Sequence, residues 1–341
     1  MQARHALNIA GAAVLLFGVS SIFNGCKSKP TVQQAVKTVL SSEDQNAMDK
    51  EQPIIECINQ TFAHFEEMTP VYFQDMDQLK QSKTKDVAFF SFKIRPFEVS
   101  HQFEDSCIDG LNKSASMLPA IPQVDATAQD TANTLKQLQA PGDALEDYIR
   151  QKGWLADNFT KGKELDATLS PLLKRLWNDM QTLENAVHDQ QTVLRKHELD
   201  AIEKEEGRNL HWHTMNSMLA ARSLNDSVVT LTKAEKLDAQ TMAAASKPLQ
   251  DALDAARTYL ATHPDEGKPD QRNMDPVWTT ISSDLDRELG AARDAQTALP
   301  ANGPLTDVDK KKARYPLQMV MYYYNQAVKS FNDAASMGVS R

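Results

Sequence analysis

One long segment of the chain does most to constrain its fold. Between Pro171 and Pro248 the sequence contains no proline and a single glycine, Gly207. Apolar residues recur through its first half at the three- and four-residue spacing of one helix face: Leu169, Leu173, Leu176, Met180, Leu183, Val187 and Leu194. The segment 172–247 is therefore predicted to be helical, as one long helix or as a helical hairpin. The seam weakens further on, at Gln190, His197, Lys204 and Arg208, which favours a break near Gly207.

The remainder of the chain is also predicted to form helices, joined by linkers rich in proline and glycine. Apolar spacing and breakers place them at 55–79, 101–116, 126–138, 143–152, 232–262, 276–298 and 306–336. The sequence APGD predicts a turn, with Asp143 as the N-cap of the next helix and Gly153 as its C′ residue. Residues 86–99 form one strand-like apolar run, and one strand makes no sheet. The predicted fold class is all-α, an elongated bundle of long helices.

The first 25 residues have the three parts of an export signal. A short start with Arg4 leads into an apolar run that ends at Phe23, and small Gly25 directly precedes Cys26. The end of this segment resembles the lipobox of bacterial lipoproteins, although Phe23 and Asn24 depart from its usual residues. That resemblance implies a cleaved signal peptide, 1–25, and a lipidated Cys26 that carries acyl chains such as palmitate. An uncleaved anchor, which needs about 20 apolar residues, and ordinary cleavage are the alternatives.

The residue after Cys26 bears on which membrane would hold the anchor. Lys27 stands where an aspartate would retain a lipoprotein at the inner membrane in enterobacteria-like sorting. We therefore expect the outer membrane, facing the periplasm, with the inner membrane as the alternative. Several acyl chains on one residue make a stable anchor, because each buried CH₂ contributes about 0.8 kcal/mol. Residues 26–50 are polar and predict a tether, either flexible or helical in part, and residues 51–338 predict the helical domain.

Two cysteines remain if Cys26 carries lipid, namely Cys57 and Cys107. An exported chain meets an oxidising environment in which paired thiols persist, and two cysteines allow one intramolecular pairing. The disulfide would close an interval of 50 residues, worth about 4 kcal/mol in the chain-entropy model. Two buried thiols are the alternative.

Composition and charge narrow the classes of partner. Hydrophobic residues make up 41% and charged residues 24% of the chain, which suits a folded body. The formal net charge is −9, and the one basic run, DKKKAR, is short. Nucleic acid is therefore not an expected partner, because binding it requires a basic surface.

Two constellations are candidate binding sites. On a helix His211, Met215 and Met218 share one face, and imidazole with thioethers is a soft donor set that suits Cu(I). Methionines at this spacing also fill apolar cores, which is the alternative. In the last helix Asn325 and Asn332 are seven residues apart beside the apolar stripe. They are placed to set helix register as buried asparagines do in coiled coils, or to contact a ligand.

The chain contains no recognised catalytic motif: no nucleophile elbow, zinc-protease signature, phosphate loop or dithiol pair. We therefore predict a chain that is not an enzyme and carries no cofactor besides the covalent lipid on Cys26.

Three stretches carry a family resemblance: YIRQKGWLADNFTKGKELDATL at 148–169, the long helix after it, and the closing YYNQAVKSFN. They resemble the YiiG-like family of bacterial lipoproteins, a domain of unknown function, over roughly residues 50–336. The middle block matches best at Tyr148, Lys152, Asp157, Phe159, Gly162 and Lys163. It departs at Trp154, Asn158 and Asp166, the last at a position where histidine is expected. The resemblance implies an envelope location and a helical body, and it supplies no activity.

The sequence therefore predicts a membrane-anchored lipoprotein of the bacterial cell envelope. Its non-catalytic helical body would bind a protein partner in the envelope or act as a structural spacer. The alternative is a periplasmic metal-binding protein that uses the face of His211, Met215 and Met218.

Overall fold

The computed structural model describes residues 40–81, 101–264, 275–303 and 305–336, and its regular elements there are helices without any strand. The all-α prediction is therefore confirmed for the part of the chain that is described. Cys26, the predicted signal segment and the strand-like run 86–99 lie outside these residues. The chain divides into two compact units at Val193 and Leu194. We call residues 42–193 the N-terminal bundle and residues 194–336 the C-terminal bundle.

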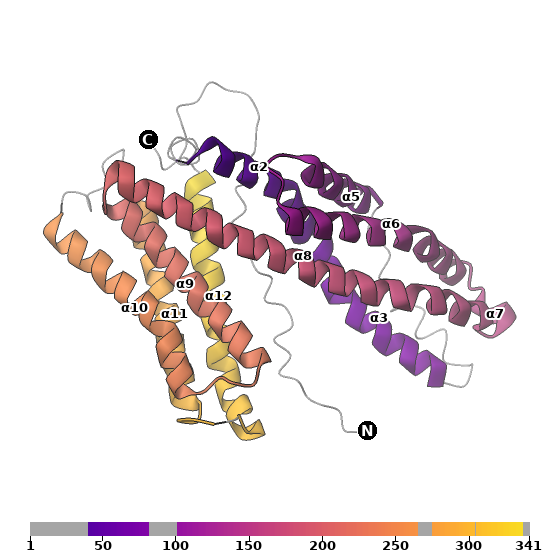
Figure 1. The fold of residues 1–341 in the computed structure, drawn as a ribbon. Coiled ribbons are helices and arrows are strands. Elements are labelled where there is room, and N and C mark those ends of the chain that lie inside the picture. The colour runs from indigo at the N-terminus through magenta and orange to yellow at the C-terminus, as the bar shows by residue number, and fades with distance from the viewer. Residues whose placement is uncertain (1–39, 82–100, 265–274, 304, 337–341) are drawn as a thin grey trace. The chain divides into compact units, whose positions relative to one another are not determined.

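The N-terminal bundle packs α2 against α5 and α5 against α6 (Figure 1). Its buried side chains include Phe62, Phe65, Met76, Leu111 and Leu145. In chain order its elements are α2 (Ser42–Cys57), the π-helical turn η1 (Ile58–Phe62), α3 (Ala63–Gln81), α5 (His101–Ser116), α6 (Pro122–Arg150), the short α7 (Trp154–Asp157) and the first part of α8 (Thr160–Glu206).

One boundary differs from the sequence prediction at the start of the body. The predicted tether extends to residue 50, but α2 begins at Ser42 and buries Ala47 and Lys50. The end of the predicted tether is thus helical, which the sequence left open, and the polar residue Lys50 occupies a core position for a reason given below. The body predicted over 51–338 contains two compact units, and its division into domains stays a prediction.

The APGD turn predicted near residue 142 is absent from the structure, and α6 continues through it to Arg150. Proline inside a helix removes one hydrogen bond and costs about 3 kcal/mol. Leu138, Gly142 and Leu145 nevertheless form one buried face across Pro141. Packing on both sides of the proline keeps the helix intact, which a local turn signal does not reveal.

The end of α6 also corrects a detail of the prediction. Lys152, with φ 56°, takes the left-handed C′ position that the sequence assigned to Gly153. Its N–H donates to the carbonyl of Ile149, and the N–H of Gly153 donates to the carbonyl of Tyr148. These two bonds form a Schellman motif, so Gly153 is the following residue and serves a packing purpose.

The long proline-free segment contains more than one helix. α8 is a single helix of 47 residues that ends at Glu206, and Gly207 follows it with φ 76°. α9 (Leu210–Lys233) begins after Asn209, whose side chain accepts a hydrogen bond from the N–H of Trp212. The predicted break near Gly207 is confirmed. A second break, before α10 (Ala239–Thr262), places the start of that helix seven residues later than predicted.

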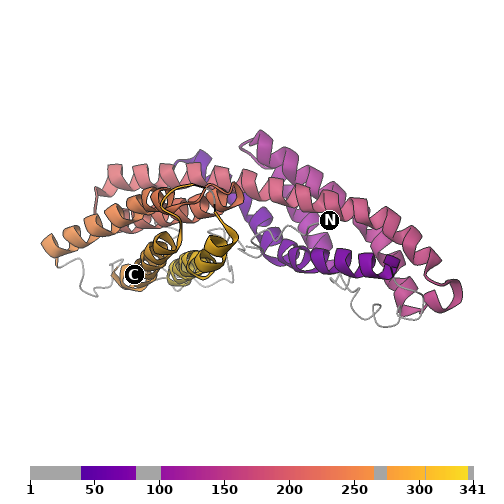
Figure 2. The same cartoon turned by 90° about the horizontal axis from the view of Figure 1, so that it is seen from below.

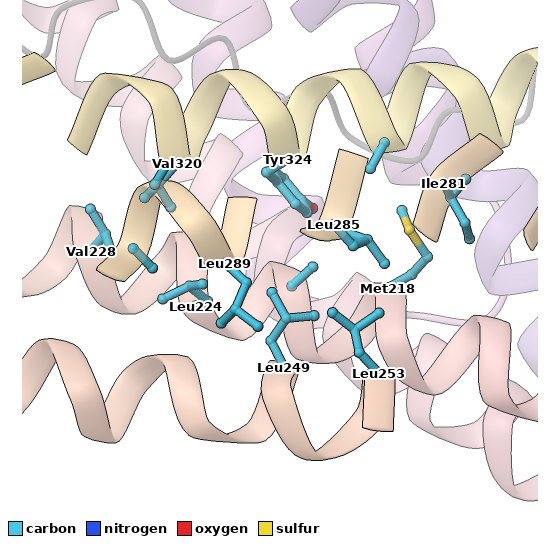
Figure 3. Close-up of a cluster of buried hydrophobic side chains, with 14 of the residues drawn as sticks. Met218, Leu224, Val228, Leu249, Leu253, Ile281, Leu285, Leu289, Val320 and Tyr324 are labelled. Carbon is cyan, nitrogen blue, oxygen red and sulfur yellow. The ribbon is translucent and has the colours of Figure 1, made fainter. Parts of the chain in front are cut away.

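The C-terminal bundle adds α11 (Asp275–Ala298) and α12 (Asp307–Ser336), both within one residue of their predicted starts. α11 packs along α12, and α10 packs against α9 and α11, as both views show (Figure 1 and Figure 2). The interior is apolar (Figure 3) and includes Met218, Leu224, Val228, Leu249, Leu253, Ile281, Leu285, Leu289, Val320 and Tyr324. Among the described helices, none combines the length and apolarity that a membrane span requires.

Candidate functional site

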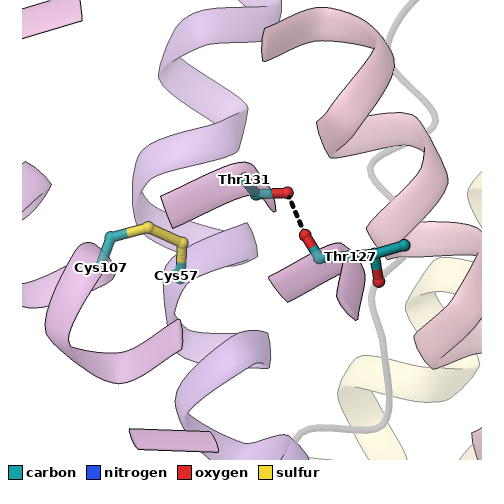
Figure 4. Close-up of a disulfide and its surroundings, with 4 residues drawn as sticks. All are labelled: Cys57, Cys107, Thr127 and Thr131. Carbon is teal, nitrogen blue, oxygen red and sulfur yellow. Dashed lines mark hydrogen bonds between the residues drawn. A yellow bond between two sulfur atoms is a disulfide. The ribbon is translucent and has the colours of Figure 1, made fainter. Parts of the chain in front are cut away.

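The predicted disulfide is present and joins two helices. Cys57 at the end of α2 and Cys107 in α5 are bonded, with their Cα atoms 4.7 Å apart (Figure 4). Both residues are only 3% exposed. The helices approach closely at this point, because a Cβ added to Gly110 would lie 3.3 Å from the carbonyl oxygen of Pro53. The crosslink therefore fixes the α2–α5 contact from inside the bundle.

The structure separates the three predicted metal ligands into different surroundings. Met218 belongs to the main apolar core of the C-terminal bundle, and Met215 packs with Ile202 and Trp212 in a smaller cluster. The His211 ring nitrogen Nδ1 lies 3.2 Å from Oε2 of Glu206, across the turn between α8 and α9. Within the described residues, no three His, Cys, Asp or Glu side chains are grouped to hold a metal ion. The metal hypothesis therefore has no support, and apolar packing accounts for both methionines.

Asn325 and Asn332 lie where the sequence places them, on the flank of the α12 core stripe. Both side chains are half-buried, beside the buried residues Tyr324 and Val328. Their proposed role in helix register stays a prediction.

A buried lysine closes one end of the N-terminal bundle. Lys50 is completely buried, and its Nζ donates to the carbonyl oxygens of Met117 and Pro119, each at 2.8 Å. The same nitrogen lies 2.6 Å from Oδ1 of Asp125 in the first turn of α6. One side chain of α2 thus holds the connection between α5 and α6. Sequence reasoning missed this role because lysine is rarely buried unless it is paired.

The family block forms a compact aromatic turn between α6 and α8. The Tyr148 hydroxyl donates to Oδ1 of Asp157 at 2.7 Å, and the backbone N–H groups of Phe159 and Lys161 donate to the same carboxylate at 3.0 Å. The Tyr148 hydroxyl bond and these N–H groups hold the pKa of Asp157 below its usual value. Asp157 therefore organises the turn as an anion. This position matches the resemblance, and it shows a structural use for the residue.

Two positions of this block require glycine, because an aromatic ring lies against each of them. A Cβ on Gly153 would lie 2.5 Å from the Tyr148 ring, and one on Gly162 would lie 2.4 Å from the Phe159 ring. Asn158, with φ 58°, ends α7 in the left-handed region, where asparagine is better tolerated than most residues. The departure at Asn158 thus fits the turn geometry.

Asp166, which stands where histidine was expected, is a buried hydrogen-bond acceptor. The Tyr72 hydroxyl donates to its Oδ1 at 2.8 Å and the Ser170 hydroxyl donates to the same oxygen at 2.6 Å. Burial, followed by the Asp166 charge, raises the pKa of Tyr72. The contact ties α3 to α8, so the block carries a charge in a structural position.

The interior of the C-terminal bundle contains a second buried acid, Glu288 of α11. Its side chain is completely buried, and neither carboxylate oxygen has a hydrogen-bond partner among the described residues. Burial raises the pKa of Glu288 well above its ordinary value, which favours the neutral acid inside the fold. Glu288 acts electrostatically on the buried Tyr324 of α12, as do Arg222 and Asp226 of α9.

The same interior holds a buried ion pair on the last part of α8. Nη1 of Arg195 lies 2.7 Å from Oε2 of Glu198, and both side chains are less than a tenth exposed. Arg195 also acts on Tyr324, so charged groups from several helices surround this tyrosine. A neutral carboxyl in such surroundings can store or donate a proton. The arrangement shows no nucleophile oriented by a base, and its visible role is packing.

The fold and these contacts define a class: an all-α protein with a disulfide-linked N-terminal bundle and buried polar side chains at core positions. The family described as "Protein of unknown function (DUF3829)" matches residues 45–333. The chain belongs to this family, which confirms the resemblance to YiiG-like proteins. The "Uncharacterized protein YiiG" of Escherichia coli (strain K12) is 21% identical over 193 residues, covering 52% of this chain and 54% of YiiG. The chain thus spans about half the length of this relative. No solved structure matches the chain.

Proposed function

We propose that this protein is a lipid-anchored component of the bacterial cell envelope whose helical body acts as a binding or spacing module without catalytic activity. The observation that carries the proposal is the use of the three cysteines. Cys57 and Cys107 are paired in a buried disulfide, as suits an oxidising compartment. Cys26 is the one cysteine that remains, and it follows the apolar segment 1–25 at a lipobox-like site.

The contacts inside the body favour a rigid module over an enzyme. Lys50, Asp157 and Asp166 each direct their charge at groups that hold neighbouring helices or turns together. Lys50 and Asp166 are buried, and buried polar groups engaged in this way stabilise one arrangement of the helices. Asp157, which is partly exposed, holds the turn between α6 and α8 in the same manner. Such a body suits the presentation of a fixed surface to a protein partner.

Cys26→Ser tests the anchor directly. In a bacterial host fed an alkyne analogue of palmitate, the wild-type protein should be labelled, fractionate with membranes and lose its first 25 residues. The Cys26→Ser variant should carry no label and should remain a precursor or leave the membrane. The matched control, Cys57→Ala with Cys107→Ala, should still be labelled. An unlabelled wild-type protein, or a Cys26→Ser variant that is membrane-bound at the mature size, contradicts the proposal.

The outer-membrane location has its own test. Lys27→Asp should move the lipidated protein from the outer- to the inner-membrane fraction on a density gradient, whereas Lys27→Ser should leave it in place. Equal distributions of the two variants would contradict this sorting step.

Crosslinking in intact cells tests whether the helical body binds a protein partner. A body that captures no partner would act as a spacer.

A further inference from the structure

Helix α12 has a second face, opposite its core face, that is exposed and carries both aromatic and basic side chains. We define the outer face of α12 as Val308, Lys311, Lys312, Tyr315, Gln318 and Tyr322, all of them exposed. Val308, Tyr315 and Tyr322 follow one another at intervals of seven residues, so they lie in one row along the helix. The core face on the other side contains Leu317, Val320 and Tyr324.

The apolar part of this face is unusual for the bundle. Val308 is 60% exposed, Tyr315 is 69% exposed and Tyr322 is 51% exposed. Among the described residues of the C-terminal bundle, the exposed large hydrophobic side chains are these three, and all of them belong to this row. Exposed apolar residues that are scattered need no explanation. These three are aligned, so they offer a surface along α12 one line of apolar contacts.

The charge of the same face contrasts with that of the whole protein. The first turn of α12 is acidic, with Asp307 and Asp309 on either side of Val308. From Lys310 to Asn332, however, no Asp or Glu occurs, on a chain whose formal net charge is −9. Lys310 bonds to Glu235 at 2.9 Å, whereas Lys311, Lys312 and Arg314 are exposed beside the tyrosines. Beyond its acidic first turn, where Lys312 acts electrostatically on Asp309, the outer face is basic on an acidic protein. Its complement is an anionic surface.

We infer that the outer face of α12 docks onto the anionic phosphate headgroups of the membrane to which the protein is attached. Tyrosine at headgroup level with lysine and arginine around it is the composition of helices that lie on membrane surfaces. Each basic residue near an anionic surface strengthens association roughly fivefold. The remaining acidic surface is repelled by the same lipids, so one face is selected. The inference rests on the proposed lipid anchor, which keeps the body at high local concentration beside the bilayer.

The test uses the full lipidated chain, reconstituted into vesicles of phosphatidylethanolamine with either phosphatidylglycerol or phosphatidylcholine. A photo-crosslinking p-benzoylphenylalanine replaces Tyr315, and in a control it replaces Lys247, whose side chain is 71% exposed on α10. Position 315 should form phospholipid adducts in phosphatidylglycerol vesicles and lose most of them at high salt, because salt screens exposed charges. Position 247 should form few in either vesicle.

Charge reversal provides the matched comparison. Lys311→Glu with Lys312→Glu should reduce the adducts at position 315 at least tenfold, from the roughly fivefold contribution of each base. The control, Lys247→Glu with Arg287→Glu, changes the net charge equally on α10 and α11 and should leave the adducts unchanged. Equal yields at positions 315 and 247, equal losses in the two double variants, or adducts formed with protein instead of lipid would each overturn the inference.

Flotation separates this inference from the lipid anchor. A lipidated chain floats with neutral vesicles even at high salt, because acyl chains hold it by the hydrophobic effect. If it floats but position 315 contacts no lipid, the docking face is wrong and the anchor stands. If it fails to float with neutral vesicles but binds phosphatidylglycerol vesicles through Lys311 and Lys312, the anchor is wrong and the docking face stands. Failure to float with either vesicle overturns both.

Discussion

Reduction of the Cys57–Cys107 disulfide should lower the stability of the N-terminal bundle by an amount that follows from its place in the chain. The crosslink closes a loop with a sequence separation of 50 residues. In the chain-entropy model such a loop contributes about 4 kcal/mol at 25 °C, because it restricts the unfolded chain. For a bundle of about 150 residues, each kcal/mol moves the midpoint of thermal unfolding by about 2–4 °C, so reduction should lower it by about 8–16 °C.

The assay needs a signal from one bundle at a time, because two compact units do not guarantee one cooperative transition. Trp154 and Trp177 lie in the N-terminal bundle, and Trp212 and Trp278 lie in the C-terminal bundle. In a Trp212→Phe, Trp278→Phe background, tryptophan fluorescence reports the N-terminal bundle alone. Urea unfolding of this chain with and without dithiothreitol then measures the contribution of the crosslink to the free energy of unfolding.

The control is the Cys57→Ala, Cys107→Ala chain in the same background. Its stability should match that of the reduced protein within about 1 kcal/mol and should not respond to dithiothreitol, because the two sulfur sites are buried and small. A reductant effect below about 1 kcal/mol in the disulfide-containing chain would refute the reasoning, and so would an equal effect in the alanine variant. Thiol labelling of the unfolded, unreduced chain should leave both cysteines unmodified.

Three further changes test the buried polar groups and the aromatic turn. Lys50→Met should cost about 3 kcal/mol in urea unfolding, because it removes the partner of Asp125 and two carbonyl contacts. Gly162→Ala should cost about 1–3 kcal/mol, since its Cβ would collide with the Phe159 ring, whereas Gly290→Ala, with no atom within 4 Å, should be neutral or stabilising. Ionisation of Glu288 should lower the stability of the wild-type protein as the pH rises above 4.5 toward the raised native pKa, with a slope of up to about 1.4 kcal/mol per pH unit. Glu288→Gln should remove this loss of stability. A wild-type protein as pH-independent as the variant in this range would contradict the assignment of Glu288.

Helix identity was predictable from the sequence because spacing and breakers act locally, and α5, α11 and α12 begin within one residue of their predicted starts. The errors occur where tertiary packing outweighs a local signal. Pro141 is a strong breaker in isolation, but the helix on both sides of it is anchored by buried leucines. Lys152 occupies the C′ position of α6, and the Tyr148 ring requires a glycine at the position after it. Local sequence rules do not include this contact with the ring.

The buried polar residues were missed for a different reason, which their spacing makes clear. Ala47 and Ile54 of α2 leave a gap in the three-and-four repeat, and Lys50 fills it. In α11 Leu289 already continues the repeat from Leu285 to Ala292, so the spacing does not mark Glu288. The weakening of the α8 seam after Leu194 was likewise assigned to the wrong residues. The buried positions there continue through Glu198 to Ile202, while His197 and Lys204 face solvent.

A polar residue at a core position is therefore a signal in its own right when the apolar repeat resumes on both sides of it. The repeat fixes which way the side chain points, and burial then requires either a partner or a neutral form. Lys50 and Asp166 have found partners across helices, and these contacts determine how α2 and α3 meet α6 and α8. For Glu288, burial raises the pKa, which favours the neutral form. Spacing identifies such a position where the apolar repeat has a gap, as at Lys50. It does not say which solution the residue adopts, because the partner belongs to another helix. The three-dimensional contacts are needed to distinguish a buried polar residue that joins two helices from a buried acid that binds a proton.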